Sequence, residues 1–144
     1  MKMLRIVNRL IPLKAYTALT QWPLLFIRKE NEGLFDKTAE RHENIHAWQQ
    51  IEVMLVCFTL LALMAWVGWL SWWWLFTSPL GFDLFYGIEY LVRLLLYRDK
   101  MEAYRNVSFE QEAYLRHHDP DYLSYRKCFA WMPFLKKKTW RKRR

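Results

Sequence analysis

The segment His42-Glu43-Asn44-Ile45-His46 has the residue types and the spacing of a catalytic zinc site. Residues four apart lie on one face of an α-helix, so His42 and His46 can bind one Zn²⁺ ion. Glu43 lies beside them and can take a proton from a water molecule that the metal polarises. A chain with four histidines in 144 residues contains this pattern by chance roughly 0.007 times. The motif therefore predicts a metal-dependent hydrolytic site.

A catalytic zinc site of this kind needs a third protein ligand and leaves the fourth position to water. Glu110 and Glu112 stand in the segment 106–114, where Ser108 can cap a helix. The two carboxylates lie on different faces of such a helix, and their spacing leaves both open as the third ligand.

Three further polar residues lie close to these motifs in the sequence. Gln49 follows His46 by one helical turn on the same face, where it can contact a substrate or satisfy a neighbouring backbone group; the alternative is a polar residue at the membrane boundary without such a role. His117 and His118 precede an Asp-Pro-Asp segment, which indicates a solvated loop, with a rival metal site as the alternative.

Two motifs together resemble the gluzincin class of zinc metallopeptidases, and most closely a family of small, poorly characterised bacterial metallopeptidases. The first has the form H-E-x-I-H-x-x-Q-Q and lies at 42–50, and the second has the form Y-x-N-[IV]-x-F-E-x-E-A-Y and lies at 104–114. The resemblance covers most of residues 12–128 and brings no known substrate. It implies a zinc peptidase with Glu110 as the third ligand and Ala113 as the small residue that the gluzincin pattern requires.

The chain departs from the gluzincin pattern at Tyr114, where the pattern has an aspartate. The resemblance implies that this aspartate orients one of the motif histidines, so the chain lacks that acidic partner. Glu112 and Tyr114 are candidates for contacts to the substrate or to the ligands themselves.

The elements that must position the motif can be predicted from the residues around it. Residues 22–27 predict a short strand, and Pro23 makes it an edge strand or the start of a strand, because proline supplies no backbone N–H. A substrate peptide can add to such an edge in extended form. Asp36 or Thr38 can cap the following helix, which we expect to run from about residue 38 into the tryptophans.

Residues 53–82 contain no Asp, Glu, Lys, Arg or His. The 18 residues 53–70 would extend roughly 27 Å as a helix, close to the hydrocarbon thickness of a bilayer. Tryptophans cluster at the far end, where indole rings favour the membrane interface. A second apolar helix over 82–97 carries Glu89 and Arg93, which are four apart and can pair. The pattern predicts an apolar hairpin over about 53–97, either two spans or one re-entrant hairpin.

The alternative is a soluble protein that buries this hairpin, but the remaining chain is too short to cover a tryptophan-dense helix on every side. The formal charge is +8, and much of the excess lies in residues 136–144. Anionic lipid and nucleic acid both attract such a tail, and the hairpin favours lipid. Both ends of a hairpin lie on one side of the membrane, and the Lys and Arg outside it place that side in the cytoplasm.

The sequence thus predicts a mainly α, minimal zincin-like domain over 1–135, with a short edge strand or small sheet and a membrane-associated apolar hairpin, followed by a basic tail over 136–144. The expected function is zinc-dependent hydrolysis of a peptide or protein substrate at the cytoplasmic membrane surface. The alternative is a non-catalytic membrane or nucleic-acid-binding protein with a structural zinc. A fourth protein ligand in place of water would favour that alternative.

Overall fold

The structure, a computed structural model of the 144-residue chain, describes residues 3–12, 16–136 and 140. It is mainly helical with one small sheet, as the composition predicts. In chain order the elements are β1 (Leu4–Asn8), β2 (Ala18–Gln21), β3 (Leu24–Arg28), η1 (Lys29–Leu34), α1 (Lys37–Trp66), η2 (Trp72–Thr77), α2 (Leu80–Tyr97), α3 (Lys100–Arg105), α4 (Ser108–Arg116), α5 (Tyr122–Tyr125) and η3 (Met132–Phe134). Most of the basic tail lies outside the described residues.

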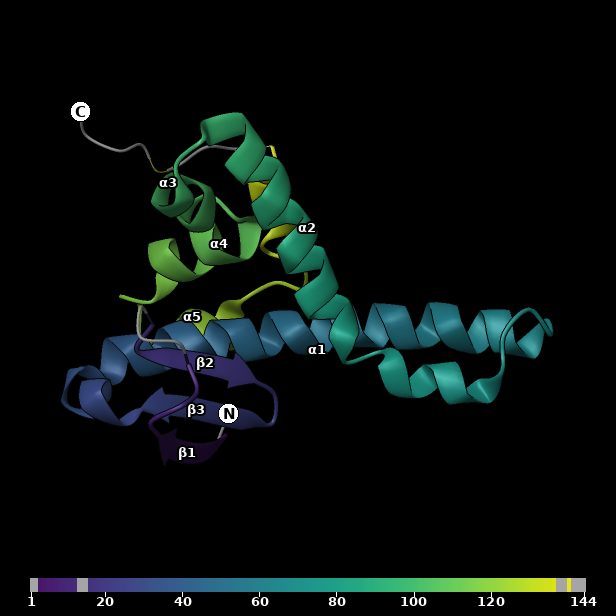
Figure 1. Cartoon of the computed structure of the whole chain (residues 1–144), viewed down its shortest axis with the longest axis horizontal. Helices are drawn as coiled ribbons and strands as arrows, with labels where there is room; N and C mark the ends of the chain where they lie inside the picture. Colours follow the sequence, from purple (N-terminus) through teal and green to yellow (C-terminus); the bar gives the residue numbers. More distant parts are fainter. Residues whose placement is uncertain (1–2, 13–15, 137–139, 141–144) are drawn as a thin grey trace. The chain divides into compact units, whose positions relative to one another are not determined.

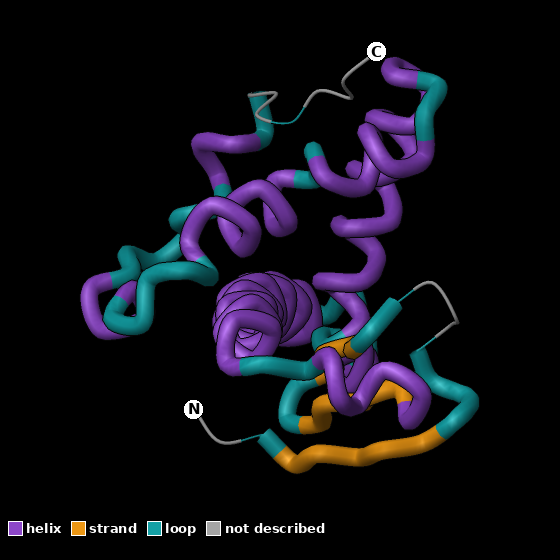
Figure 2. The backbone as a smooth tube through the Cα atoms, turned by 90° about the vertical axis from the view of Figure 1, so that its left-hand side faces the viewer, coloured by secondary structure: helices purple, strands orange, loops and turns teal. Residues whose placement is uncertain are grey.

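The sheet has the strand order β1-β3-β2, with β1 parallel and β2 antiparallel to β3. The expected edge position of the 22–27 strand is wrong, because β3 lies between two partners. Pro23 precedes β3, so residues 24–28 all keep the N–H groups that two ladders need. The expectation of a strand start at proline is confirmed. Figures 1 and 2 show the three strands beside the first turns of α1, and β2 is an edge strand.

The long helix α1 begins and ends at local signals in the sequence. Asp36 caps its start, since its Oδ1 accepts the backbone N–H of Ala39 at 2.7 Å. The helix ends at Trp66, and Gly68 follows with a φ of +79°. Glycine adopts this left-handed conformation without the steric cost that a side chain would add. The predicted helix from about residue 38 into the tryptophans is confirmed.

The chain turns back through η2 and starts α2 beside α1 (Figure 1). Gly81 makes this close approach, because a Cβ atom at this position would overlap the Cys57 sulfur. The second apolar helix expected over 82–97 is confirmed as α2. Its first turns pack against α1, because Phe82 and Val53 belong to one buried cluster.

The helix α2 turns Glu89 and Arg93 toward the protein and a row of apolar side chains outward. The predicted pair is present, with Arg93 Nη2 at 2.6 Å from Glu89 Oε1, and both side chains are largely buried. Glu89 also accepts from the backbone N–H and the hydroxyl of Ser108, at the start of α4. The outward face carries exposed apolar side chains at helical spacing: Leu84, Ile88, Leu91, Val92, Leu95 and Leu96.

Contacts divide the chain into two compact units. The first comprises 1–48 and 112–127, and its described core is formed by Ile45, Ala113 and Tyr122. The second comprises 49–111 and 128–144, and its described core is formed by Val53, Phe82, Val107, Phe109 and Trp131. Each unit thus includes packing of α1 against α4.

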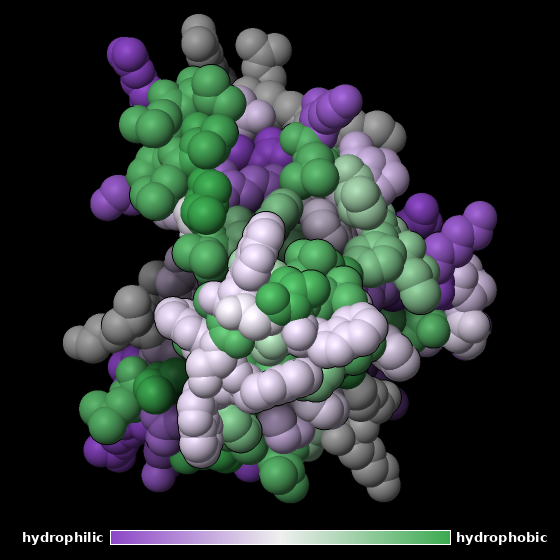
Figure 3. All heavy atoms as spheres, turned by 90° about the vertical axis from the view of Figure 1, so that its right-hand side faces the viewer, coloured by the Kyte–Doolittle hydropathy of each residue, from purple (hydrophilic) through white to green (hydrophobic). Residues whose placement is uncertain are grey.

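Within the described residues, α1 is the one helix that is long and apolar enough to cross a membrane. The mean hydropathy of its most apolar window is 1.6, and 28% of that window is buried. Figure 3 shows the molecule from the end of the hairpin. Residues of intermediate (pale) and high (green) hydropathy lie there, and hydrophilic (purple) residues lie mainly toward the margins. The tryptophans of this end, Trp66, Trp69, Trp72, Trp73 and Trp74, are exposed.

Candidate metal centre

The two motif histidines lie one turn apart on α1, as the spacing predicts. Their side chains are buried, with each residue 8% exposed. The Nε2 atoms of His42 and His46 are 3.0 Å apart, so the two rings present these nitrogens to the same point. Two imidazole nitrogens at this separation can bind one metal ion.

Glu110 lies in the first turn of α4 and is 3% exposed. Tyr86 of α2 donates its hydroxyl to Glu110 Oε1 at 3.0 Å, which fixes the orientation of the carboxylate. The preceding residue, Phe109, accepts the side-chain amide of Gln49 on its carbonyl at 3.1 Å. Gln49 therefore satisfies a neighbouring backbone group, which is one of the roles predicted for it, and joins the start of α4 to α1.

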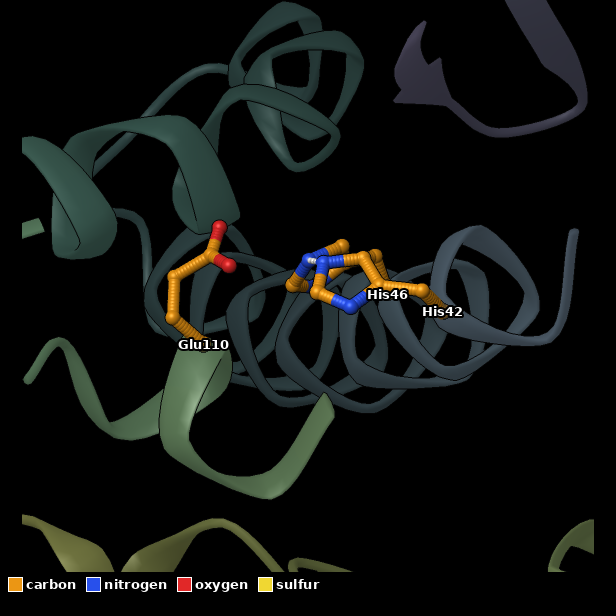
Figure 4. Close-up of side chains that lie close together, drawn as sticks. All are labelled: His42, His46 and Glu110. Carbon is orange, nitrogen blue, oxygen red and sulfur yellow. Dashed lines mark hydrogen bonds between the residues drawn. The ribbon is translucent and has the colours of Figure 1, made fainter. Parts of the chain in front are cut away.

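His42, His46 and Glu110 each offer one ligand atom, and these three atoms lie within 4.8 Å of one another. In Figure 4 the Glu110 carboxylate from α4 points toward the two imidazole rings on α1. Two imidazoles and one carboxylate are a donor set that zinc accepts, as do other first-row transition metals. The group can therefore hold a metal ion, and all three side chains are buried.

Glu112, the other glutamate left open by the sequence, has a different environment. Arg126 Nε donates to Glu112 Oε1 at 2.6 Å, and the Tyr122 hydroxyl donates to the same oxygen at 3.0 Å. Burial and the Glu112 carboxylate raise the pKa of Tyr122, so its hydroxyl keeps the proton that it donates. Glu112 belongs to a buried ion pair, and the structure groups Glu110 with the histidines instead.

Glu43, the expected general base, lies between the two histidines in sequence and is half-buried. The Thr20 hydroxyl donates to Glu43 Oε2 at 2.7 Å. Thr20 belongs to the edge strand β2, so this strand and the motif helix are joined at the candidate base. Glu43 is not a member of the ligand group, which leaves its carboxylate available for proton transfer.

Tyr114, at the position where the sequence departs from the gluzincin pattern, contacts a motif histidine through its ring. The ring centroids of Tyr114 and His42 are 4.7 Å apart in an edge-to-face arrangement. Tyr114 therefore packs against a candidate ligand, which is one of the roles expected for it.

His117, for which the sequence predicts a solvated loop or a rival metal site, lies beside His42. Its Nδ1 is 3.3 Å from His42 Nδ1, and its carbonyl accepts from Arg41 Nε at 2.6 Å. Burial, together with His42, His118 and Arg41, lowers the pKa of His117 to about 4. The signal that could have found it is the helical spacing 110, 113, 114 and 117, which puts these residues on one face of α4 and its C-terminal extension.

The resemblance to gluzincin-class peptidases rests on the two sequence motifs alone. No protein-family model, curated protein or solved structure matches this chain. Membership of that class stays a prediction. The function proposed below therefore rests on the arrangement of His42, His46 and Glu110.

Proposed function

We propose that this protein is a zinc-dependent peptidase of the gluzincin type that acts at the cytoplasmic surface of a membrane. The observation that carries the proposal is the group of ligand atoms from His42, His46 and Glu110, with Glu43 next to the first ligand on the same helix. Among the described residues this group has three protein ligands. Three ligands leave the fourth tetrahedral position to water, which is typical of catalytic rather than structural zinc.

The residues of this chain supply the proton transfers of peptide hydrolysis. His42, His46 and Glu110 would hold the zinc ion, which would supply polarisation of the scissile carbonyl and a lowered pKa of the attacking water. Glu43 takes one proton from the attacking water as the new C–O bond forms, and it gives that proton to the leaving nitrogen as the C–N bond breaks. Thr20 holds the Glu43 carboxylate by a 2.7 Å hydrogen bond, and Tyr86 holds the Glu110 carboxylate.

The substrate we propose is an extended peptide segment. The strand β2 lies at an edge of the described sheet, and its Thr20 contacts Glu43. A peptide that adds to this edge gains backbone hydrogen bonds and passes the candidate base. This corrects the expectation for residues 22–27, since the edge next to the motif helix is β2.

The membrane location rests on the exposure of apolar side chains in the hairpin. A helix in water turns its apolar face inward, whereas α2 buries Glu89 and Arg93 and exposes most of its leucines. Polar groups that face the protein interior are typical of helices in lipid. The exposed end of α1 carries no charge from residue 53 onward. The Lys and Arg residues outside the hairpin favour the cytoplasmic side for the site.

The test is a Glu43→Gln variant, assayed in detergent on an unfolded protein substrate. Glutamine keeps the size of the side chain but cannot accept the proton, so hydrolysis should fall by a factor of about 10²–10⁴. Zinc content should remain that of the unaltered chain. Glu40→Gln is the matched control, because Glu40 lies on the same helix and pairs with Arg5.

Each outcome of this experiment has one meaning. Inactive Glu43→Gln with bound zinc and active Glu40→Gln would support the proposed mechanism. Equal hydrolysis by Glu43→Gln and the unaltered chain would refute the role of Glu43. Bound zinc with no hydrolysis by any variant would favour a structural zinc.

A further inference from the structure

The ring of His42 makes close contacts through both of its nitrogen atoms. Its Nε2 lies 3.0 Å from His46 Nε2, on the side of the ligand group. Its Nδ1 lies 3.3 Å from His117 Nδ1, on the opposite side of the ring. His42 is therefore placed between the candidate metal and a second histidine.

The chemistry of imidazole decides whether His42 or His117 carries the proton between their two Nδ1 atoms. A histidine that binds a metal through Nε2 is neutral and carries its proton on Nδ1, where it acts as a donor. A buried N–H group without an acceptor destabilises the state that contains it. A neutral His117 has one ring nitrogen that accepts, and its Nδ1 is the atom within reach.

We infer that His117 is a positioning residue that accepts the Nδ1–H of His42 and thereby fixes the orientation of this ring for metal binding. The inference rests on the metal site of the proposed function. Metal-binding histidines commonly donate their second N–H to a carboxylate, a carbonyl or water, and here another histidine takes that place. His117 contacts no reacting atom, so it acts only through His42.

The backbone of His117 is held independently of its ring. Its N–H donates to the Ala113 carbonyl at 2.9 Å, which extends α4 by one hydrogen bond. Its carbonyl accepts from Arg41, the residue before His42 on α1. Tyr114 packs against both rings, with centroids 4.7 Å from His42 and 5.7 Å from His117. These contacts fix the acceptor before any metal binds.

The same tautomer has a consequence for His118. If His117 accepts at Nδ1, its own proton is on Nε2, which lies 3.0 Å from His118 Nε2. His118 is exposed, so water can replace it as an acceptor. Changing His118 should therefore leave metal binding intact, which makes it the matched control. In this state His117 cannot itself bind a metal through Nε2.

The experiment compares the zinc affinity of His117→Leu, His117→Asn and His118→Leu in the purified, detergent-solubilised chain, by competition with a chromophoric chelator. Leucine removes the acceptor, and the affinity should fall by about 10–100-fold. Asparagine puts an oxygen near the place of Nδ1 and should restore the affinity to within about threefold. The visible spectrum of Co²⁺ in the site should change for His117→Leu and recover for His117→Asn. Thermal unfolding of the metal-free variants shows whether each one folds.

A weakened leucine variant with a rescued asparagine variant would support the inference. Equal affinity in all variants, or equal loss in both His117 variants, would overturn it and leave the proposed function standing. A second bound zinc that both His117 variants lose would also overturn it, because His117 would then be a ligand. If the unaltered chain bound no zinc, both the inference and the proposed function would fall.

Discussion

At the scale of single residues, two glutamates two positions apart on α4 have opposite electrostatic environments. Glu112 is fully buried, and its charge is balanced by Arg126. A buried charge without such a partner is strongly destabilising, so the loss of either member of this pair should weaken the fold. Glu110 points to the two imidazoles instead, where a bound cation would balance its charge.

This contrast predicts opposite phenotypes for two matched substitutions. Glu112→Gln should lower the free energy of unfolding by about 3 kcal/mol, because the buried Arg126 loses its counter-charge, and should leave zinc binding in the folded protein unchanged. Glu110→Gln should weaken zinc binding, because an amide is a poorer ligand than a carboxylate. Chemical denaturation and metal titration measure the two effects. Zinc loss in Glu112→Gln alone would mean that the assignment of the two glutamates is reversed.

The candidate ligands on α1 could be predicted from the sequence because residues four apart lie on one face of a helix. The 3.6-residue period of the helix is enough to predict that His42 and His46 share a face and that Glu43 lies beside them. The residue pattern alone could not show which of Glu110 and Glu112 is the third candidate ligand. That choice depends on Arg126, which is distant in sequence but forms an ion pair with Glu112. His117 was missed because the Asp-Pro-Asp segment that follows it indicated a loop.

At the scale of elements, the helices could be predicted more fully than the sheet. The start of α1 at Asp36 and its end before Gly68 are encoded locally, by a cap and by a glycine that adopts a positive φ. The parallel pairing of β1 with β3 joins residues 20 positions apart, such as Leu4 and Leu24. Short strands with non-local partners carry little sequence signal, so β1 and β2 were not expected.

The helix α2 shows why a count of charges can mislead. Asp83, Glu89 and Arg93 all lie within the 18 residues of α2, and among the described helices α1 is the one that length and composition mark as a possible span. The structure turns Glu89 and Arg93 against each other and against the Ser108 end of α4. Tertiary contacts decide whether a charged side chain of a helix faces the protein or its surroundings, and the composition of the helix does not contain this information.

At the scale of the whole molecule, the proposed membrane location predicts how the protein fractionates. The exposed apolar surface of α1 and α2 should keep the chain in the membrane pellet through a wash at high salt, because salt screens charge but strengthens apolar burial. Detergent should release it. A variant that lacks residues 137–144 should remain in the pellet, because the basic tail only adds attraction to anionic lipid. Release of the full chain by salt as a soluble monomer would mean that the tail makes the membrane contact and that the hairpin is a soluble core.

The most direct test of the central claim is the zinc content of the whole protein, purified in detergent and supplied with excess zinc before dialysis. Two histidines and one glutamate in a buried group predict about one zinc ion per chain. The double variant His42→Ala, His46→Ala should hold none, and the His118→Leu control should hold as much as the unaltered chain. An unaltered chain without zinc, or a double variant that retains it, would contradict the proposed site.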